Sequence, residues 1–146
     1  NLYGSCLHRI RTALAGSAGS VLGGVLFWQG ESDARPTTVY AQPTTYAAQL
    51  VRWVKVLRAD LDMPELPFVF AQLGPTPTDT TLTAWDTVKA QQVLARNALT
   101  RVGMITTDDL TPLGTSAGDS AHFNAASYVE AGRRFADALT DLEAQP

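Results

Sequence analysis

The sequence of 146 residues has few cysteines, few histidines and no long hydrophobic run. Its single cysteine, Cys6, excludes an internal disulfide and a multi-cysteine metal site, and we expect it to be a small buried residue. Two histidines without a nearby carboxylate cluster argue against a zinc site, so no metal is expected. No apolar run approaches the roughly 20 residues that a membrane-spanning helix needs, so no membrane partner is expected.

Positive charge and phosphate-binding motifs are also scarce. The net charge of −3 argues against nucleic-acid binding, which usually requires a basic face. The glycine-containing stretch 16–24 has neither the G-x-G-x-x-G pattern nor the lysine of a P-loop, so no nucleotide cofactor is expected. With 45% hydrophobic and 17% charged residues, the composition is typical of one packed domain.

The hydrophobic pattern alternates between helices and strands. Helical spacing predicts helices over about residues 2–15, 46–61 and 85–99, and a last helix that follows Asn124 as its N-cap. Continuous apolar runs predict strands at 21–28, 67–73 and 101–107, each buried on both faces. This order indicates an α/β fold with a parallel sheet between helices. Three strands are few for such a sheet, so we expect it to continue in a segment or partner outside this chain.

Polar residues follow each predicted strand. Gln29-Gly30-Glu31 comes after the first strand, Gln72 lies near the end of the second, and the loop 107–122 follows the third. Because ligands of open α/β sheets bind beyond the carboxyl ends of the strands, we expect these groups to converge on one rim.

The last of these loops holds the pair Asp119 and His122, spaced as D-x-x-H. A carboxylate at this spacing can accept a hydrogen bond from Nδ1 of the histidine and leave Nε2 free as a general base. In the alternative interpretation, Asp119 caps the following helix and His122 is a surface residue. The other histidine, His8, lies in the first predicted helix and is expected to face solvent.

Two residues at the end of the first strand have two interpretations each. Gln29 either satisfies backbone groups there or donates its amide to an oxyanion that forms beside His122. Glu31 is either a general acid or an acceptor that holds the loop. The three tryptophans are expected in the core rather than on a sugar-binding platform. They are Trp28, Trp53 and Trp85.

Several segments resemble one family of hydrolases. The stretches "GVLFWQGESDA", "LPFVFAQL" and "DSAHFN…GRRFADAL" are similar to the sialate O-acetylesterase-like branch of the SGNH hydrolases, which includes acetyl xylan esterases. The resemblance covers nearly the whole chain. It implies a flavodoxin-like three-layer α/β/α fold and a cofactor-free Ser-His-Asp esterase acting on carbohydrate acetyl esters, with an extracellular or periplasmic location favoured.

The resemblance also implies roles for individual residues. His122 would be the base and Asp119 its orienting partner. Gln29 would be the side-chain donor to the oxyanion, and Glu31 a supporting residue of the Q-G-E block. Lys89 stands where the family commonly has arginine, and we expect this difference to affect how Glu31 or its loop is held.

The family's nucleophilic serine belongs to an N-terminal G-Q-S-N-like block that this sequence does not contain. We therefore expect residues 1–146 to be the C-terminal part of a single SGNH-hydrolase-like domain. An N-terminal companion chain, or a second copy across the sheet edge, would then complete it. Ser32 is the internal alternative to an external serine, because it lies close to Gln29.

The rival hypothesis is a degenerate, non-catalytic module that binds glycans or assembles with a partner. In an esterase, the loops 34–44 and 74–83 would set substrate choice, but their composition identifies neither a sugar nor an acyl chain.

Overall fold

A computed structural model describes residues 2–37 and 41–145. Helices and strands alternate along the described chain. The helices are α1 (Leu2–Gly16), α2 (Tyr46–Leu61), α3 (Trp85–Asn97), the 3₁₀ turn η1 (Asp119–Ala121) and α4 (Ala125–Glu143). The strands are β1 (Val25–Trp28), β2 (Phe68–Ala71) and β3 (Val102–Ile105). This confirms the α/β fold class.

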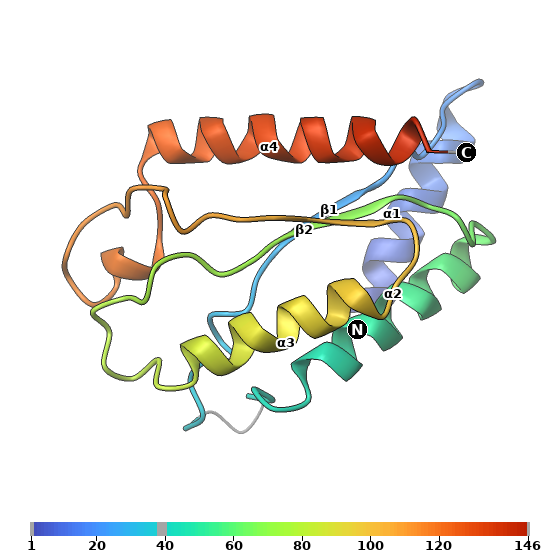
Figure 1. Ribbon diagram of the computed structural model, residues 1–146. Helices are drawn as coiled ribbons and strands as arrows, with labels where there is room; N and C mark the ends of the chain where they lie inside the picture. The colour runs from blue at the N-terminus through green and yellow to red at the C-terminus, as the bar shows by residue number, and fades with distance from the viewer. Residues whose placement is uncertain (1, 38–40, 146) are drawn as a thin grey trace.

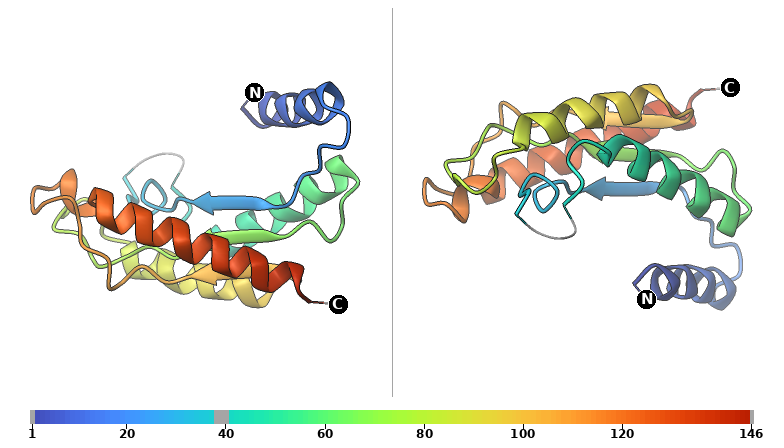
Figure 2. Two further views of the ribbon diagram at one scale, coloured as in Figure 1. Left: turned by 90° about the horizontal axis from the view of Figure 1, so that it is seen from above. Right: turned by 90° about the horizontal axis from the view of Figure 1, so that it is seen from below.

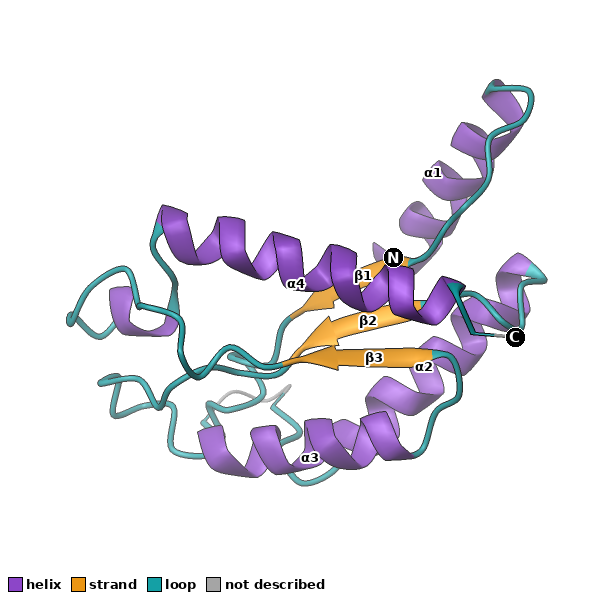
Figure 3. Ribbon diagram, turned by 45° about the horizontal axis from the view of Figure 1, so that its top comes forward, coloured by secondary structure: helices purple, strands orange, loops and turns teal. Residues whose placement is uncertain are grey.

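The three strands form one parallel sheet in the order β1-β2-β3. Val25 pairs with Phe68, and Phe68 pairs in turn with Val102. Helix α4 covers one face of the sheet, and α2 and α3 lie side by side on the other (Figure 1). The three arrows point toward the same end of the molecule, where the loops that follow them gather (Figure 3). The molecule therefore has the expected α/β/α layers.

The central strand β2 divides the interior into two cores. All of its residues are buried, and their side chains alternate between the two faces of the sheet. Phe68 and Phe70 belong to the core under α2 and α3. Val69 and Ala71 belong to the core under α4, with Phe123. The continuous apolar run in the sequence thus reflects a strand covered on both sides.

Each long helix buries one stripe and leaves the other side in water. In α2, Tyr46, Leu50 and Val54 recur at four-residue spacing and are buried. Helix α4 starts as predicted at Asn124, whose side-chain oxygen accepts a hydrogen bond of 2.9 Å from the N–H of Ser127. None of the helices in the described ranges is both long and apolar enough to cross a membrane.

Helix α1 stands apart from the layers (Figure 2). The Tyr3 hydroxyl donates to the Asp60 carboxylate at 2.5 Å, which ties α1 to the end of α2. Leu7 is the one buried residue of this helix. The prediction that Cys6 is buried is wrong, because α1 has no second layer against it and the thiol is exposed. The prediction that His8 faces solvent is confirmed.

The first strand departs from its prediction. The run 21–28 was expected to be buried on both faces, but only Val25–Trp28 form a strand, and Leu26 is 55% exposed. The reason is that β1 lies at an edge of the described sheet, beside β2 only. The tryptophans lie in the interior as expected: Trp85 is buried, and Trp28 and Trp53 pack against the two cores.

Candidate active site

The loops that follow the three strands form a pocket at the carboxyl end of the sheet. Its volume is about 250 Å³, and Glu31, Ser32 and His122 are among the residues that line it. The predicted convergence on one rim is therefore seen for the loops after β1 and β3. The loop after β2 contributes Asp79 and Leu82 to the same pocket.

His122 is held at the pocket by its backbone and by the next residue. Its carbonyl oxygen accepts a hydrogen bond of 2.8 Å from the N–H of Leu113. Phe123 is buried, and its ring centroid lies 5.1 Å from that of Trp28. Since the neighbouring Phe123 is anchored in the core, the exposed imidazole of His122 stays at the pocket wall.

Asp119 begins the short turn η1, which ends just before His122. Its carboxylate accepts a hydrogen bond of 2.6 Å from the Ser116 hydroxyl. Asp119 and His122 are linked by a backbone hydrogen bond of 3.2 Å from the His122 N–H to the Asp119 carbonyl. Asp119 does not cap α4, because Asn124 does so. Its pairing with the imidazole stays a prediction.

The Q-G-E block forms a sharp turn at the end of β1. Gly30 has φ +152, which side-chain-bearing residues rarely adopt, and a Cβ atom there would lie 3.1 Å from Val88. The turn directs Glu31 into the pocket with His122, and a Glu31 oxygen accepts a hydrogen bond of 3.0 Å from the Gly30 N–H. Only glycine therefore fits the middle of this block.

Gln29 lies on the other side of that turn. Its side-chain nitrogen donates to Asp33 at 3.1 Å, and its carbonyl accepts from the Tyr46 hydroxyl at 2.9 Å. It lines a separate pocket against α2, together with Phe27. The structure does not bring Gln29 and His122 together in one pocket, and the oxyanion role stays a prediction.

Two other residues from the sequence analysis support the loops rather than line the pocket. Gln72 is buried and donates a hydrogen bond of 3.1 Å to the carbonyl of Lys89. The Lys89 ammonium forms an ion pair with Asp108 and donates at 3.2 Å to the carbonyl of Gly74. Lys89 thus joins the loops after β2 and β3, and these contacts do not involve Glu31.

The sequence analysis missed three residues that shape the pocket. Arg35 and Asp79 line it and form an ion pair of 2.9 Å. The pKa of Asp79 lies below its usual value, mainly because its carboxylate accepts hydrogen bonds from the hydroxyl and the N–H of Thr81. The positive charge of Arg35 lowers it less. Arg134 of α4 binds Asp109 and the Thr106 carbonyl in the β3–α4 loop. The one local signal was the D-T-T sequence at 79–81, which is typical of a turn closed by an aspartate side chain.

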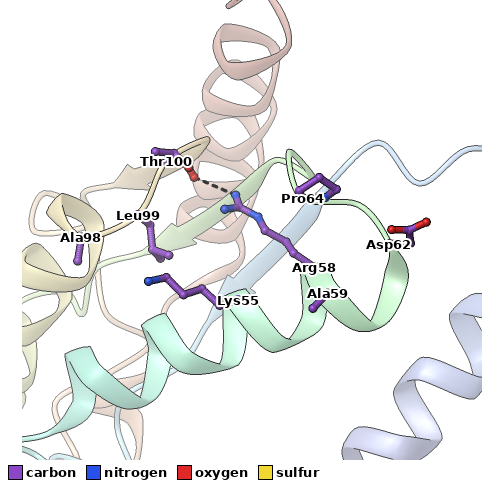
Figure 4. Close-up of a pocket in the computed structure, with 8 residues that line it drawn as sticks. All are labelled: Lys55, Arg58, Ala59, Asp62, Pro64, Ala98, Leu99 and Thr100. Atoms are coloured by element: carbon purple, nitrogen blue, oxygen red, sulfur yellow. Dashed lines mark hydrogen bonds between the residues drawn. The ribbon is translucent and has the colours of Figure 1, made fainter.

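A larger pocket of about 520 Å³ lies at the opposite, amino end of the strands (Figure 4). Its centre is Arg58, whose guanidinium donates to the carbonyls of Leu66 and Thr100 at 2.9 Å. These bonds satisfy backbone groups that precede β2 and β3. Neither histidine nor serine lines this pocket, so the smaller one is the candidate active site.

Among residues 2–37 and 41–145, no group of three or more histidines, cysteines and carboxylates could hold a metal ion. Residues 38–40 of the predicted specificity loop 34–44 lie outside the described residues.

Comparison with known proteins places this chain in a family. The sequence matches the profile of "carbohydrate esterase, sialic acid-specific acetylesterase" over residues 1–141. No curated protein matches it. The fold is similar to that of an Arabidopsis thaliana protein, with a TM-score of 0.77 and 25% identity over 97% of this chain and 52% of that one. It is also similar to a carbohydrate acetylesterase from Xanthomonas citri, with a TM-score of 0.60 and 23% identity over 80% of this chain and 25% of that one.

The chain therefore spans about half the length of the Arabidopsis protein and a quarter of the Xanthomonas protein. These findings confirm the resemblance seen in the sequence. With a match that covers residues 1–141, the chain belongs to the carbohydrate esterase family of sialic acid-specific acetylesterases.

Proposed function

We propose that this chain carries the histidine half of a serine esterase that removes O-acetyl groups from carbohydrates. The observation that carries the proposal is the shared pocket of His122, Glu31 and Ser32 at the carboxyl end of a parallel sheet. The family membership supports the reaction class, and the carbohydrate and the acyl group are part of the proposal.

In the proposed mechanism, a serine hydroxyl attacks the carbonyl carbon of the ester. His122 accepts the serine proton at Nε2 and returns it to the leaving sugar oxygen, and a water molecule then hydrolyses the acyl-enzyme by the same route. Asp119 stabilises the imidazolium. The backbone hydrogen bond of 3.2 Å from the His122 N–H to the Asp119 carbonyl supports this pairing, because it keeps the two residues next to each other at the end of η1. Gln29 and backbone N–H groups stabilise the oxyanion.

The acid that assists His122 has a second candidate. The Asp119 carboxylate already accepts a hydrogen bond from Ser116, whereas Glu31 lines the pocket of His122. Replacing Asp119 by Asn and, separately, Glu31 by Gln distinguishes the two. The variant that removes the partner of the imidazole should lose kcat by about 10⁴-fold, as in other triads.

We propose that the serine comes from a segment or chain that pairs with the outer edge of β1, which has no strand partner among the described residues. Leu26 on this strand is 55% exposed on a face of the sheet, and a segment that extends the sheet beyond β1 and packs against that face would cover it. A second copy across the same edge is the alternative partner. Ser32 stays the internal alternative, because it lines the pocket of His122.

The test is an esterase assay on the full-length protein with p-nitrophenyl acetate and with acetylated sugars. We expect His122→Ala to abolish turnover and His8→Ala, which changes the other histidine on the exposed face of α1, to leave it unchanged. Near-wild-type activity of His122→Ala would overturn the proposal. Loss of activity in Ser32→Ala, with the acyl-enzyme mass absent, would identify Ser32 as the nucleophile.

A non-catalytic module is the second candidate, favoured by the same exposed edge. Stable assembly with a partner or binding of glycans, with no esterase activity in the assembled protein, would support it.

A further inference from the structure

The loop after β2, residues 74–83, lies between the other two walls of the pocket and is bonded to both. The three loops lie next to one another at the ends of the arrows in Figure 3. On the side of β1, the Asp79 carboxylate accepts a hydrogen bond of 2.9 Å from Arg35. The N–H of Ala84, just after the loop, donates to the carbonyl of Ala34 at 3.0 Å.

On the side of β3, the neighbouring residue Thr78 makes two hydrogen bonds. Its N–H donates to the Ser120 hydroxyl at 3.0 Å, and its own hydroxyl donates to the carbonyl of Thr115 at 2.8 Å. Ser120 is 7% exposed and lies two residues before His122. Its hydroxyl donates in turn to the carbonyl of Ala117 at 3.1 Å, so the bond to Thr78 reaches the turn that carries His122.

The loop also forms a closed turn just after Thr78 and Asp79. The second oxygen of the Asp79 carboxylate accepts hydrogen bonds from the N–H and the hydroxyl of Thr81, at 2.9 and 2.6 Å. The side chain of Asp79 is 12% exposed. Adjacent residues of one loop, Thr78 and Asp79, therefore bind opposite walls of the pocket, and the turn that follows them holds the Asp79 carboxylate in place.

We propose that Thr78 and Asp79 form a brace, the 78–79 brace, that fixes the distance of His122 from the wall of Glu31 and Ser32. Thr78 is then a positioning residue for His122, which it reaches through Thr115 and Ser120. The inference rests on the proposed esterase function. A general base must lie within hydrogen-bond reach of the proton it accepts, and small displacements of such a group reduce the rate strongly.

The experiment compares three variants of the full-length enzyme. Thr78→Val removes the hydroxyl that binds Thr115 and keeps the shape of the side chain, whereas Thr78→Ser keeps the hydroxyl. Thr140→Val makes the same chemical change outside the pocket, at an exposed residue of α4 whose hydroxyl donates to the carbonyl of Ala136 at 3.0 Å. The measurements are kcat and KM for p-nitrophenyl acetate, and the rate at which diethyl pyrocarbonate modifies His122 relative to His8.

We expect Thr78→Val to lower kcat about 10-fold with KM changed less than twofold, because the histidine acts in the transition state. His122 should be modified at a changed rate, while His8 is not. Thr78→Ser and Thr140→Val should match the wild type. If Thr78→Val does not fold, Ser120→Ala, which removes the acceptor of the Thr78 N–H, takes its place with the same expected result.

Wild-type kcat and wild-type modification of His122 in Thr78→Val would overturn the brace, as would an equal loss in Thr78→Ser. These outcomes differ from failure of the proposed function. In that case His122→Ala retains activity, and the modification rates still report whether the brace holds His122.

Discussion

The guanidinium of Arg134 in α4 binds the carboxylate of Asp109 through both terminal nitrogens, at 2.7 and 2.5 Å. One of these nitrogens also donates to the carbonyl of Thr106 at 2.8 Å, and Nε of the same residue donates to Glu130 at 2.9 Å. The start of the loop that carries His122 is thereby fixed to the helix that follows it.

The ion pairs of Arg134 should make stability depend on pH in the acidic range. Hydrogen bonds from Arg134 lower the pKa of Asp109 from 3.8 to about 2, and those from Arg133 and then Arg134 lower the pKa of Glu130 from 4.5 to about 2. A carboxyl group whose pKa is lower in the folded state stabilises the folded protein at pH values above its ordinary pKa. This stabilisation is lost as the pH falls toward 2.

We therefore expect Arg134→Met to have a lower melting temperature than the wild type at pH 7. The difference in melting temperature should narrow between pH 4.5 and pH 2. Thermal unfolding followed by circular dichroism at several pH values measures this. Arg133→Met is the comparison variant, because Arg133 pairs with Glu130 and Asp137 of α4 and leaves the bond to Asp109 intact. It should lose only the part of the pH-dependent stability that comes from Glu130, so its difference from the wild type should be the smaller one. The ion pairs of Arg134 with Asp109 and Glu130 are accessible to solvent, so added salt should reduce the difference in melting temperature. An equal difference at pH 2 and pH 7 would contradict the assignment.

Gly74 allows the loop after β2 to pass closely over Phe123. A Cβ atom at this position would lie 2.5 Å from the Phe123 ring and 3.2 Å from the Thr107 carbonyl. We expect Gly74→Ala to lower the free energy of unfolding by about 1–3 kcal/mol, because the buried ring and the backbone must both shift. The activity should fall as well, since Phe123 anchors His122.

Gly132→Ala is the matched control for Gly74→Ala. A Cβ atom on Gly132, within α4, meets nothing within 4 Å. Alanine should therefore stabilise the helix by about 0.5–1 kcal/mol. Chemical denaturation measures the free energy of unfolding of both variants. A destabilised Gly132→Ala or an unaffected Gly74→Ala would show that these glycines are packed differently from the structure described.

Gln92 joins the ends of two strands from inside the core. It is fully buried, its Oε1 accepts a hydrogen bond of 2.8 Å from the Leu73 N–H, and its Nε2 donates to the Gln29 carbonyl at 3.2 Å. Gln92→Leu keeps the volume and leaves the Leu73 N–H without a partner. We expect the free energy of unfolding, measured by urea denaturation, to fall by about 1–3 kcal/mol. Gln49→Leu, at an exposed position of α2, should cost much less, and equal effects would contradict the role of the bond.

The thiol of Cys6 should react in the native protein. It is free and exposed on α1. We expect one equivalent to react with Ellman's reagent without denaturant, at the rate of an ordinary accessible thiol, and Cys6→Ser to abolish the reaction. A thiol that reacts only after unfolding would show that α1 is covered in solution.

Much of the fold was predictable because its signals are local. The stripe of α2, the N-cap Asn124 and the apolar run of β2 each depend on residues near one another in the sequence. The buried Cys6 and the double burial of β1 were predicted wrongly, because exposure depends on which elements pack outside them. That information is carried by distant segments and is absent from a local pattern.

The site was predictable only in part for the same reason. The position of His122 and Glu31 at one rim follows from parallel topology. The hydrogen-bond partners of the residues around them do not follow from topology. Gln29 binds Asp33, and Asp79 binds Arg35 from a loop 44 positions away in the sequence. Such pairings depend on loop conformations that no short motif specifies.

The parallel register has a kinetic consequence. Val25 pairs with Phe68, and Phe68 with Val102, so each sheet contact joins segments separated by a whole helix. No hairpin can nucleate this sheet, and large loops must close before any strand pair forms. The rate of folding should therefore fall below that of helical bundles of equal size, whose contacts are mostly local.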